Sequence, residues 1–205
     1  MTINGDRLTA GWANSLANLC GAVAVSYYNH ETTLNAIKLL TDQGLSQVNI
    51  HAMIAHETFA STCNLLKAKS DPRLENLNAI IFLSLKQRGR GIHHTPLSQN
   101  EFAILINMAI DLGVPFGMDS CSAHKFLQVT GDKYLQSVEP CEAGLFSAYI
   151  NVEGRFFPCS FTEEGAGLDV VNCHNFLEDV WYHPQTIAWR RQLISAGRHC
   201  PVYNI

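Results

Sequence analysis

Cysteine offers the clearest chemistry in this sequence, and Cys141 and Cys159 are spaced to act together. Between them, Phe146 to Asn151 alternates apolar with small or polar residues, as a half-buried strand does. Glu153-Gly154 follows as a turn, because glycine tolerates a positive φ, and Arg155 to Phe157 returns as a second strand. The pattern predicts a β-hairpin with both thiols at its open end, which suits a metal ion or an iron–sulfur cluster. Two reduced cysteines in an ordinary hairpin are the alternative.

The composition limits the class of protein. Apolar residues make up 47% of the 205 residues and charged residues 16%, which is typical of a globular chain with a core rather than a disordered one. The net charge is −4 and the isoelectric point about 6.1, with no dominant basic patch. The sequence therefore gives no electrostatic reason to expect a nucleic-acid partner.

The sequence also predicts a reducing compartment. Met1 to Arg7 is polar and lacks the apolar core of a signal peptide. The longest apolar runs, Ala79 to Leu83 and Ala103 to Leu105, are too short to cross a bilayer, so we expect no membrane partner. Seven cysteines without an export signal favour a cytoplasmic location, where clustered cysteines are more often metal ligands or catalytic groups than disulfides.

The elements that position these groups fall into two parts. In residues 1–121 helical and strand patterns alternate, which predicts an α/β fold with a parallel sheet. Helices are predicted at 9–19, 31–43, 58–67 and 98–111, the first with Trp12, Leu16 and Leu19 on one face, and strands at 22–27, 48–54, 79–85 and 114–118. In residues 122–205 we expect a smaller domain made of a short helix at 123–130, the hairpin, a loop at 161–171 and short helices at 175–181 and 186–195.

Working groups of parallel α/β folds lie at the carboxyl ends of the strands. The predicted ends carry Ser26, His51, the cationic loop from Lys86 to Gly91, and Cys121. A histidine there is a candidate for proton transfer, and the cationic loop for binding a carboxylate or phosphate. The alternatives are a histidine that is simply hydrogen-bonded in place and a solvated charged loop.

The spacing of Cys141, twelve residues, Gly154, four residues and Cys159 resembles the opening motif of the SPASM/twitch region of radical S-adenosylmethionine (radical SAM) proteins. Other pieces resemble the same superfamily in order: Thr2 to Gly5, Val23 to Ser26, Val48 to His51, Ile81 to Lys86, and Trp181 to Pro201. The resemblance implies a partial (β/α) barrel in residues 1–121 and a small hairpin-and-helix domain that binds an auxiliary 4Fe–4S cluster in 122–205. It also implies that Ser26 contacts the methionine part of SAM, with His51 and Lys86 as further cofactor-binding candidates.

One departure limits what the resemblance implies. Radical SAM catalysis needs a Cys-x3-Cys-x2-Cys motif, and this sequence has none: its first two cysteines, Cys20 and Cys63, are 43 positions apart. The resemblance implies that the chain begins inside the family's third strand. A missing N-terminal half or a complementary chain is therefore an expected partner, and cleavage of SAM is not assigned to this chain alone.

The resemblance also implies a ligand set. A 4Fe–4S cluster usually takes four thiolates, and we expect them from Cys121, Cys141, Cys159 and Cys200. The family often ends in Cys-x2-Cys, but position 197 is Gly here, so Cys121 is needed as the fourth ligand. Cys173 and His174 are the reserve candidates. Four thiolates also suit Zn²⁺, although the paired Cys-x2-Cys knuckles of zinc ribbons are absent.

Three hypotheses follow. The first is the C-terminal portion of a radical SAM enzyme, whose auxiliary cluster supports substrate binding or electron relay for a peptide or small-molecule substrate that the sequence does not identify. The second is a noncatalytic structural module that holds zinc or an iron–sulfur cluster. The third is an α/β domain with reduced cysteines and no metal.

Overall fold

The computed structural model describes residues 1–203 and divides the chain into two compact units. The N-terminal unit spans Met1–Asp119 and the C-terminal unit Ser120–Ile205. The sequence had predicted a boundary between residues 121 and 122, and the last two residues of that second predicted domain lie outside the described part of the chain.

The N-terminal unit is a parallel five-stranded sheet in the order β1-β2-β3-β4-β5. Its strands and helices alternate as β1 (Thr2–Ile3), α1 (Ala10–Leu19), β2 (Val23–Ser26), α2 (His30–Asp42), β3 (Val48–Ile54), α3 (Phe59–Lys67), β4 (Ala79–Ser84), α4 (Gln99–Asp111) and β5 (Phe116–Met118). Short 3₁₀ helices lie at His56–Thr58, Ala68–Ser70, Pro72–Leu74 and Gly89–His93. The predicted α/β fold with parallel strands is confirmed.

Capping side chains explain where the helices begin. Thr9 accepts a hydrogen bond from the backbone N–H of Trp12 at 3.3 Å, and Asn29 accepts one from Thr32 at 3.0 Å. Ser98 and Glu101 form the predicted capping box at the start of α4, where the Ser98 N–H donates to the Glu101 carboxylate at 2.9 Å. These contacts satisfy backbone donors that have no partner within the helix.

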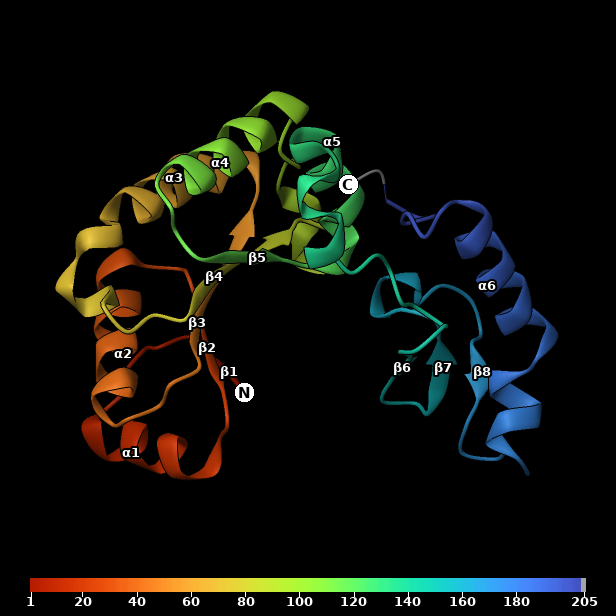
Figure 1. The fold of residues 1–205 in the computed structure, drawn as a ribbon. Helices are drawn as coiled ribbons and strands as arrows, with labels where there is room; N and C mark the ends of the chain where they lie inside the picture. Colours follow the sequence, from red (N-terminus) through yellow and green to blue (C-terminus); the bar gives the residue numbers. More distant parts are fainter. Residues whose placement is uncertain (204–205) are drawn as a thin grey trace. The chain divides into compact units, whose positions relative to one another are not determined.

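Helices α1 to α4 lie along the same side of the sheet (Figure 1). Along β3, Val48, Ile50, Ala52 and Ile54 are buried, whereas the alternating side chains, among them His51, are partly or largely exposed. Strand β4 shows the same alternation. One face of the sheet therefore forms the core with the helices, and we call the other the open face.

The face that Trp12, Leu16 and Leu19 share is not the buried face of the first helix: Trp12 and Leu19 are 69% and 84% exposed, and the residue of α1 that is buried is Ala13. One detail of the predicted α/β part is wrong. His51 was expected at a strand end, but β3 continues three residues beyond it, so His51 lies in the middle of the strand.

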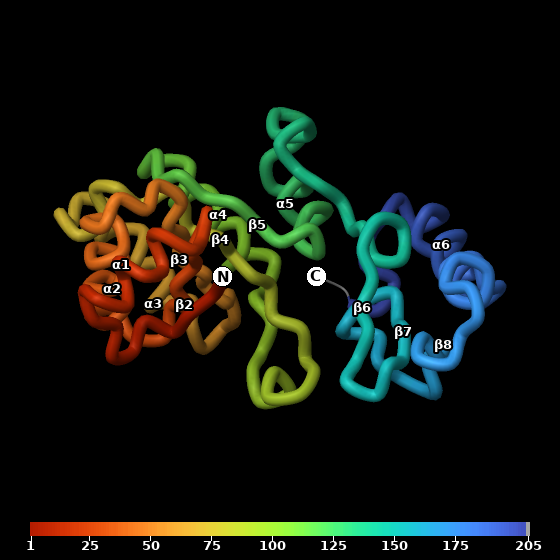
Figure 2. The backbone as a smooth tube through the Cα atoms, turned by 90° about the horizontal axis from the view of Figure 1, so that it is seen from below, coloured from red at the N-terminus to blue at the C-terminus, as the bar shows by residue number. Residues whose placement is uncertain are grey.

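The chain between β4 and α4 runs as a long loop (Figure 2).

The C-terminal unit is built from shorter pieces. It contains α5 (Ala123–Thr130), an antiparallel sheet of β6 (Tyr149–Ile150), β7 (Arg155–Phe157) and β8 (Leu168–Asp169), a π-helix at Leu177–Trp181, α6 (Pro184–Ser195), and 3₁₀ helices at Ser120–Ser122, Gly131–Ser137 and Ser160–Thr162. The predicted hairpin is confirmed, with Gly154 in its turn at a φ of 71°.

The hairpin also differs from its prediction in two places. The first strand is shorter than expected, because backbone N–H groups of Leu145 and Phe146 donate to the carbonyl of Glu142 and form a turn there. The stretch expected as a loop at 161–171 contains β8, which pairs with β7. The small sheet therefore has three strands instead of two.

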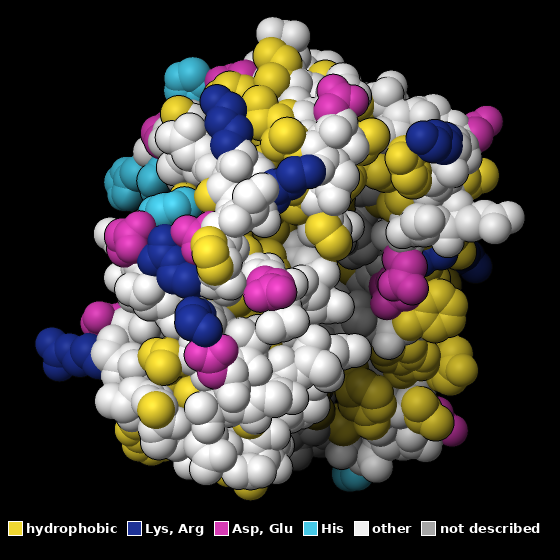
Figure 3. Space-filling view, turned by 60° about the vertical axis from the view of Figure 1, so that its left-hand side comes forward, with side chains coloured by type: hydrophobic (Ala, Val, Ile, Leu, Met, Phe, Trp, Pro, Cys, Tyr) yellow, Lys and Arg dark blue, Asp and Glu magenta, His cyan; other side chains and the backbone are white. Residues whose placement is uncertain are grey.

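Acidic and basic side chains are interspersed on the face shown in Figure 3. One example is the ion-pair group in which the Arg73 guanidinium contacts Asp71 at 2.8 Å and Glu31 at 2.7 Å. Among the described residues, no helix combines the length and apolar character that a membrane span requires.

Candidate metal centre

Three of the four predicted ligands line one pocket in the C-terminal unit. Cys121 lies on the 3₁₀ helix at Ser120–Ser122, Cys141 precedes the hairpin and Cys159 follows it. The pocket has a volume of about 280 Å³, and Pro158 and Tyr149 also line it. The predicted convergence of the hairpin cysteines therefore extends to Cys121.

The fourth predicted ligand, Cys200, is held near Cys141 by Arg198. The guanidinium of Arg198 donates to the carbonyl of Cys141 at 2.9 Å and to that of Pro140 at 2.9 Å, and its own carbonyl accepts from the Cys141 N–H at 3.3 Å. Arg198 adopts a positive φ of 61°, which turns the chain directly before Cys200. These contacts fix the tail of the chain beside Cys141.

The electrostatics of Cys141 reflect the same proximity. Burial is the largest cause that raises the pKa of the Cys141 thiol, and repulsion from the thiolates of Cys200 and Cys159 raises it further. A hydrogen bond from the backbone N–H of Ala143 acts in the opposite direction and lowers this pKa. Charges influence one another in this way only at short range. Cys141 is therefore the thiol around which the other two are arranged.

Backbone N–H groups point at two of the sulfur atoms. The N–H of Phe161 donates to Cys159 Sγ at 3.5 Å, and the N–H of Tyr203 donates to Cys200 Sγ at 3.3 Å. The rings of Phe161 and Tyr203 also meet edge to face, with centroids 6.2 Å apart. Such donors stabilise a thiolate over a thiol, and hydrogen bonds to sulfur are a feature of iron–sulfur sites.

A small apolar cluster supports Cys141 from helix α6. Cys141, Ala143 and Leu193 are buried together, and Trp189 packs against them. The indole N–H of Trp189 donates to the carbonyl of Ala143 at 2.8 Å. A Cβ added at Gly144, whose φ is 71°, would lie 2.8 Å from Trp189 Cδ1, so only glycine allows this close approach.

The pocket is not a closed ion site. Among residues 1–203, no group of three or more His, Cys, Asp or Glu side chains is arranged to hold a metal ion. Every cysteine is a free thiol. Cys121, Cys141 and Cys159 therefore line one pocket as free thiols.

The remaining cysteines have separate environments. Cys63 is buried in α3, which raises its thiol pKa, as expected for a core residue. Cys20 caps the end of α1. Cys173, the reserve candidate, donates its S–H to the carbonyl of Val170 at 3.2 Å. None of these three lines the pocket.

The cofactor-binding candidates of the N-terminal unit form two separate places. Ser26 and His51 are register partners on β2 and β3, so they lie side by side in the sheet. Burial lowers the pKa of His51, and the positive charge of the N-terminus adds to the effect. The register partner of His51 on β4 is Ile81. Lys86 follows Ile81 by five residues, beyond the end of β4, so it lies roughly 16 Å farther along the strand direction.

Lys86 is committed to an ion pair within the unit. Its ammonium group contacts the carboxylate of Asp119, which also accepts the N–H of Ser84 at 3.2 Å. The side chain of Lys86 is only 7% exposed. This charge neutralises a neighbouring carboxylate, so the expected anion-binding loop lacks its first cation.

Sequence reasoning missed Arg198, which holds the Cys141 segment from a position far along the chain. Trp189 also holds this segment, through its hydrogen bond to the carbonyl of Ala143. The dipeptide Gly197-Arg198, both at positive φ, was the local signal of a tight turn before Cys200. No local pattern indicates the partner that each of these side chains contacts.

Comparison with known proteins gives a likeness of fold. No protein-family model and no curated protein matches the sequence. The solved structures that match include native anSMEcpe with bound AdoMet and its hexahistidine-tagged form with bound AdoMet, each with 13% sequence identity and a TM-score of 0.51. The matches cover 80% of this chain, but 50% and 48% of those chains, so this chain spans about half their length. The likeness is one of fold, between the α/β architecture of this chain and that of an AdoMet-bound protein.

Proposed function

We propose that the C-terminal unit holds an auxiliary 4Fe–4S cluster on Cys121, Cys141, Cys159 and Cys200, and that the chain is the C-terminal portion of a radical SAM enzyme. The observation that carries the proposal is the convergence of three of these cysteines on one pocket, with the fourth beside Cys141. The likeness of fold to an AdoMet-bound structure supports the family.

The likeness of fold, rather than the arrangement of the thiols, favours a cluster over zinc. A zinc ion draws four ligands to one centre, whereas a 4Fe–4S cluster binds each thiolate through a different iron and spreads them around a larger body. Thiols that line a shared pocket are compatible with either arrangement. The N–H groups that point at Cys159 and Cys200 support the thiolate form that either metal requires.

A bound cluster would supply an electron relay or a substrate-binding iron. The residues of this chain would set the conditions for either role. The N–H donors to sulfur stabilise negative charge, and Trp189 and Leu193 exclude water from the side of Cys141. Arg198 adds a positive charge whose hydrogen bonds hold Cys141 in place. Hydrogen bonding and burial are the two means by which proteins tune such clusters.

In the N-terminal unit, the proposal assigns the open face of the sheet to SAM and substrate. Ser26, at the end of β2, is the residue for the methionine part of SAM, and His51 beside it is the candidate for proton transfer. A pKa of His51 lowered by burial leaves the imidazole neutral near pH 7, as a base requires. The cysteine triplet that binds the SAM cluster has to come from a further piece of chain or a partner.

The exposed surfaces of the N-terminal unit support such a partner. Strand β1 pairs only with β2 in the described part of the chain, and the open face carries apolar side chains such as Met53. An unpaired edge and an uncovered apolar face promote association. We expect this chain alone to self-associate on size-exclusion chromatography with light scattering. A monodisperse monomer would contradict the proposed need for a partner.

Ligand substitution tests the cluster assignment. Anaerobic reconstitution with iron and sulfide should give a brown protein whose visible absorbance bleaches with dithionite. Cys121→Ser should lose at least about half of that absorbance, because one of four thiolates is removed. Cys173→Ser is the matched control, since this thiol lies in the same unit but outside the pocket. Equal absorbance in the two variants would remove Cys121 from the ligand set.

A noncatalytic structural module is the second candidate function. The absence of a Cys-x3-Cys-x2-Cys triplet from the sequence favours it, because the chain itself then needs no SAM chemistry. A bound metal that neither bleaches with dithionite nor gives an electron paramagnetic resonance signal on reduction would support this candidate.

A further inference from the structure

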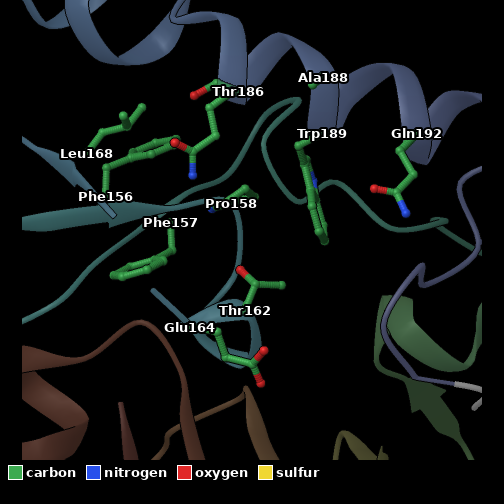
Figure 4. A pocket seen from close by; sticks show the side chains of 11 residues that line it. Phe156, Phe157, Pro158, Thr162, Glu164, Leu168, Thr186, Ala188, Trp189 and Gln192 are labelled. Atoms are coloured by element: carbon green, nitrogen blue, oxygen red, sulfur yellow. The ribbon is translucent and has the colours of Figure 1, made fainter. Parts of the chain in front are cut away.

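The C-terminal unit contains a second pocket that none of the predicted ligands lines. Its volume is about 300 Å³, at the lower end of the range for small-molecule sites. Its floor is apolar and includes Phe157, Leu168 and Trp189, whereas the exposed side chain of Gln192 forms part of a polar rim. Figure 4 shows Trp189 and Gln192 projecting from the same side of α6. An apolar floor with a polar rim is typical of a site for a small molecule.

The pocket offers a ligand no unpaired charge. None of the described residues that line it is Lys, Arg or His. Its one carboxylate, Glu164, already interacts with another group of the protein. A charged ligand would therefore lose hydration in the pocket without meeting an unpaired charge to balance its own, which is unfavourable. The lining thus favours an uncharged ligand.

Neutral hydrogen-bonding groups lie along one face of helix α6. Gln185, Trp189 and Gln192 follow the spacing i, i+4 and i+7, which places them on the same face of the helix. Along the helix axis, Gln192 is roughly 4.5 Å from Trp189 on one side and Gln185 roughly 6 Å on the other. Each glutamine side chain offers donors and an acceptor, whereas the hydroxyls of Thr162 and Thr186 already donate to backbone carbonyls at 2.7 Å and 2.8 Å. The glutamine amides are therefore the neutral polar groups for a ligand.

We propose that this pocket binds a small uncharged aromatic molecule with a hydrogen-bonding group on its ring, as aromatic amides and phenols have. The ring would lie against the indole of Trp189, because contacts between aromatic rings add to the gain from burial. The polar group would reach the side-chain amide of Gln192 at the rim. The volume admits one ring with a short substituent.

The aromatic part of the pocket is held in place before a ligand arrives. The indole N–H of Trp189 donates to the carbonyl of Ala143 at 2.8 Å, which fixes the ring and leaves its carbon surface for contact with a ligand. Phe157 is 4% exposed, and a Cβ added at Gly167 would lie 2.7 Å from its ring. Rigid aromatic surface reduces the entropy lost on binding, so a small pocket of this kind can hold a small ligand.

The pocket adjoins the cysteine pocket. Pro158 lines both pockets, and Thr162 Oγ1 accepts from the N–H of Cys159 at 3.2 Å. Trp189 packs against the buried residues that include Cys141. A ring bound against Trp189 would therefore contact a side chain that also supports a proposed cluster ligand. Binding of the ring itself does not depend on the cluster, so failure of the cluster assignment would leave this proposal standing.

Ligand titrations monitored by ¹⁹F NMR test the proposal on the full chain as purified. The protein is labelled with 5-fluorotryptophan, and the Trp189 resonance is assigned with Trp189→Phe. Benzamide should shift this resonance with saturation and leave the resonance of Trp12, in the other unit, unchanged. Cyclohexanecarboxamide, which lacks the aromatic ring, should bind at least about threefold more weakly. Benzoate, which keeps the shape but is negatively charged, should bind at least about tenfold more weakly.

A second pair of probes distinguishes two sources of such a ring. N-acetyl-tyrosine methylamide presents a phenol on a peptide backbone, whereas p-cresol presents the same phenol alone. Tighter binding of the tyrosine probe would identify a peptide side chain as the source. Equal or tighter binding of p-cresol would identify a free small molecule.

Two exposed glutamines provide the matched variants. Gln192→Leu should weaken benzamide binding by about fivefold, because a neutral hydrogen bond is lost. Gln136→Leu makes the same change on the 3₁₀ helix at Gly131–Ser137, which does not line the pocket, and should leave binding unchanged. The proposal is overturned if benzamide does not shift the Trp189 resonance, if benzoate or cyclohexanecarboxamide binds as tightly, or if the two variants bind benzamide equally.

Discussion

The two units of this chain differ in what holds them together. The N-terminal unit has a continuous apolar core in which strands β2 to β4 and helices α2 to α4 all bury side chains. The C-terminal unit has strands of two or three residues, and its buried apolar residues are few, among them Phe156, Val180 and Leu193. Burial of apolar surface is the main favourable term in folding. Packing of apolar side chains therefore contributes more to the first unit than to the second.

The difference indicates which unit the proposed cluster would stabilise. Small domains with limited cores are commonly stabilised by a metal or by disulfides, and all the cysteines here are free thiols. The thiols that line a common pocket belong to three segments of the C-terminal unit that otherwise share little core. A metal bound to these thiols would join the three segments. On this account the cluster is part of the fold of one unit and irrelevant to the other.

The largest expected effect is the loss of a central ligand. In the cluster-loaded protein, Cys159→Ser should speed amide hydrogen exchange in residues 120–203 by at least about tenfold, because metal binding contributes directly to folding free energy. Exchange in residues 1–119 should not change. Hydrogen-exchange mass spectrometry resolves the two ranges, with Cys173→Ser as the control. Faster exchange in both units would remove the distinction between them.

The next effect concerns the packed unit. Phe82 is fully buried in β4, with its ring 5.7 Å from that of Phe116. Phe82→Ala should lower the free energy of unfolding of the N-terminal unit by about 3–5 kcal/mol, through lost burial and a cavity. Phe146→Ala, at a side chain that is 76% exposed in the C-terminal unit, should change stability by less than about 0.5 kcal/mol. Urea denaturation measures both, and similar costs at the two sites would contradict the described packing.

A smaller effect is expected where the backbone approaches Trp189. Gly144→Ala combines a positive φ with a contact of 2.8 Å to the indole, and we expect it to destabilise the C-terminal unit by roughly 2–3 kcal/mol. Gly165→Ala has a similar φ of 78° but open space around its Cβ, so it should cost only about 1 kcal/mol. The thermal midpoint of each variant checks the difference. If the two midpoints fall equally, contact with Trp189 does not support the pocket.

The smallest effect is a gradual acid sensitivity of the N-terminal unit. Hydrogen bonds from Ser98 and His56 lower the pKa of Glu101 to about 2, and those from Arg73 lower the pKa of Asp71 to about 2. Because both values are lowered by folding, their contribution is complete above the ordinary pKa of a carboxyl and is lost as the pH falls from about 4.5 toward 2. Urea midpoints measured across this range should decline, and Asp71→Asn should flatten the decline. An unchanged slope in that variant would exclude Asp71 as a contributor.

The same contrast explains how much the sequence predicts. Strand β3 and helix α5 match their predicted residues, and the capping box at Ser98 forms as expected, because periodicity and capping depend on near neighbours. Periodicity does not predict which face of α1 is buried, because the exposure of Trp12 depends on which elements cover the helix. Strand β8 was missed, because two residues become a strand only through pairing with β7.

For the site, local sequence patterns predicted which cysteines come together but not the long-range hydrogen bonds that position them. The hairpin pattern predicted that Cys141 and Cys159 lie close together, and the position of Cys121 after a strand pattern placed it near them. The hydrogen bond between Arg198 and Cys141 joins residues that are 57 positions apart, and that between Trp189 and Ala143 spans 46. Such pairs are set by tertiary packing, and no local sequence signal encodes them.

The central claim is that the C-terminal unit binds a 4Fe–4S cluster. The most direct test is the content of iron, acid-labile sulfide and zinc in protein purified without oxygen. We expect about four irons and four sulfides per chain, and loss of both in the Cys141→Ser variant. One zinc without sulfide, or no metal at all, would contradict the claim.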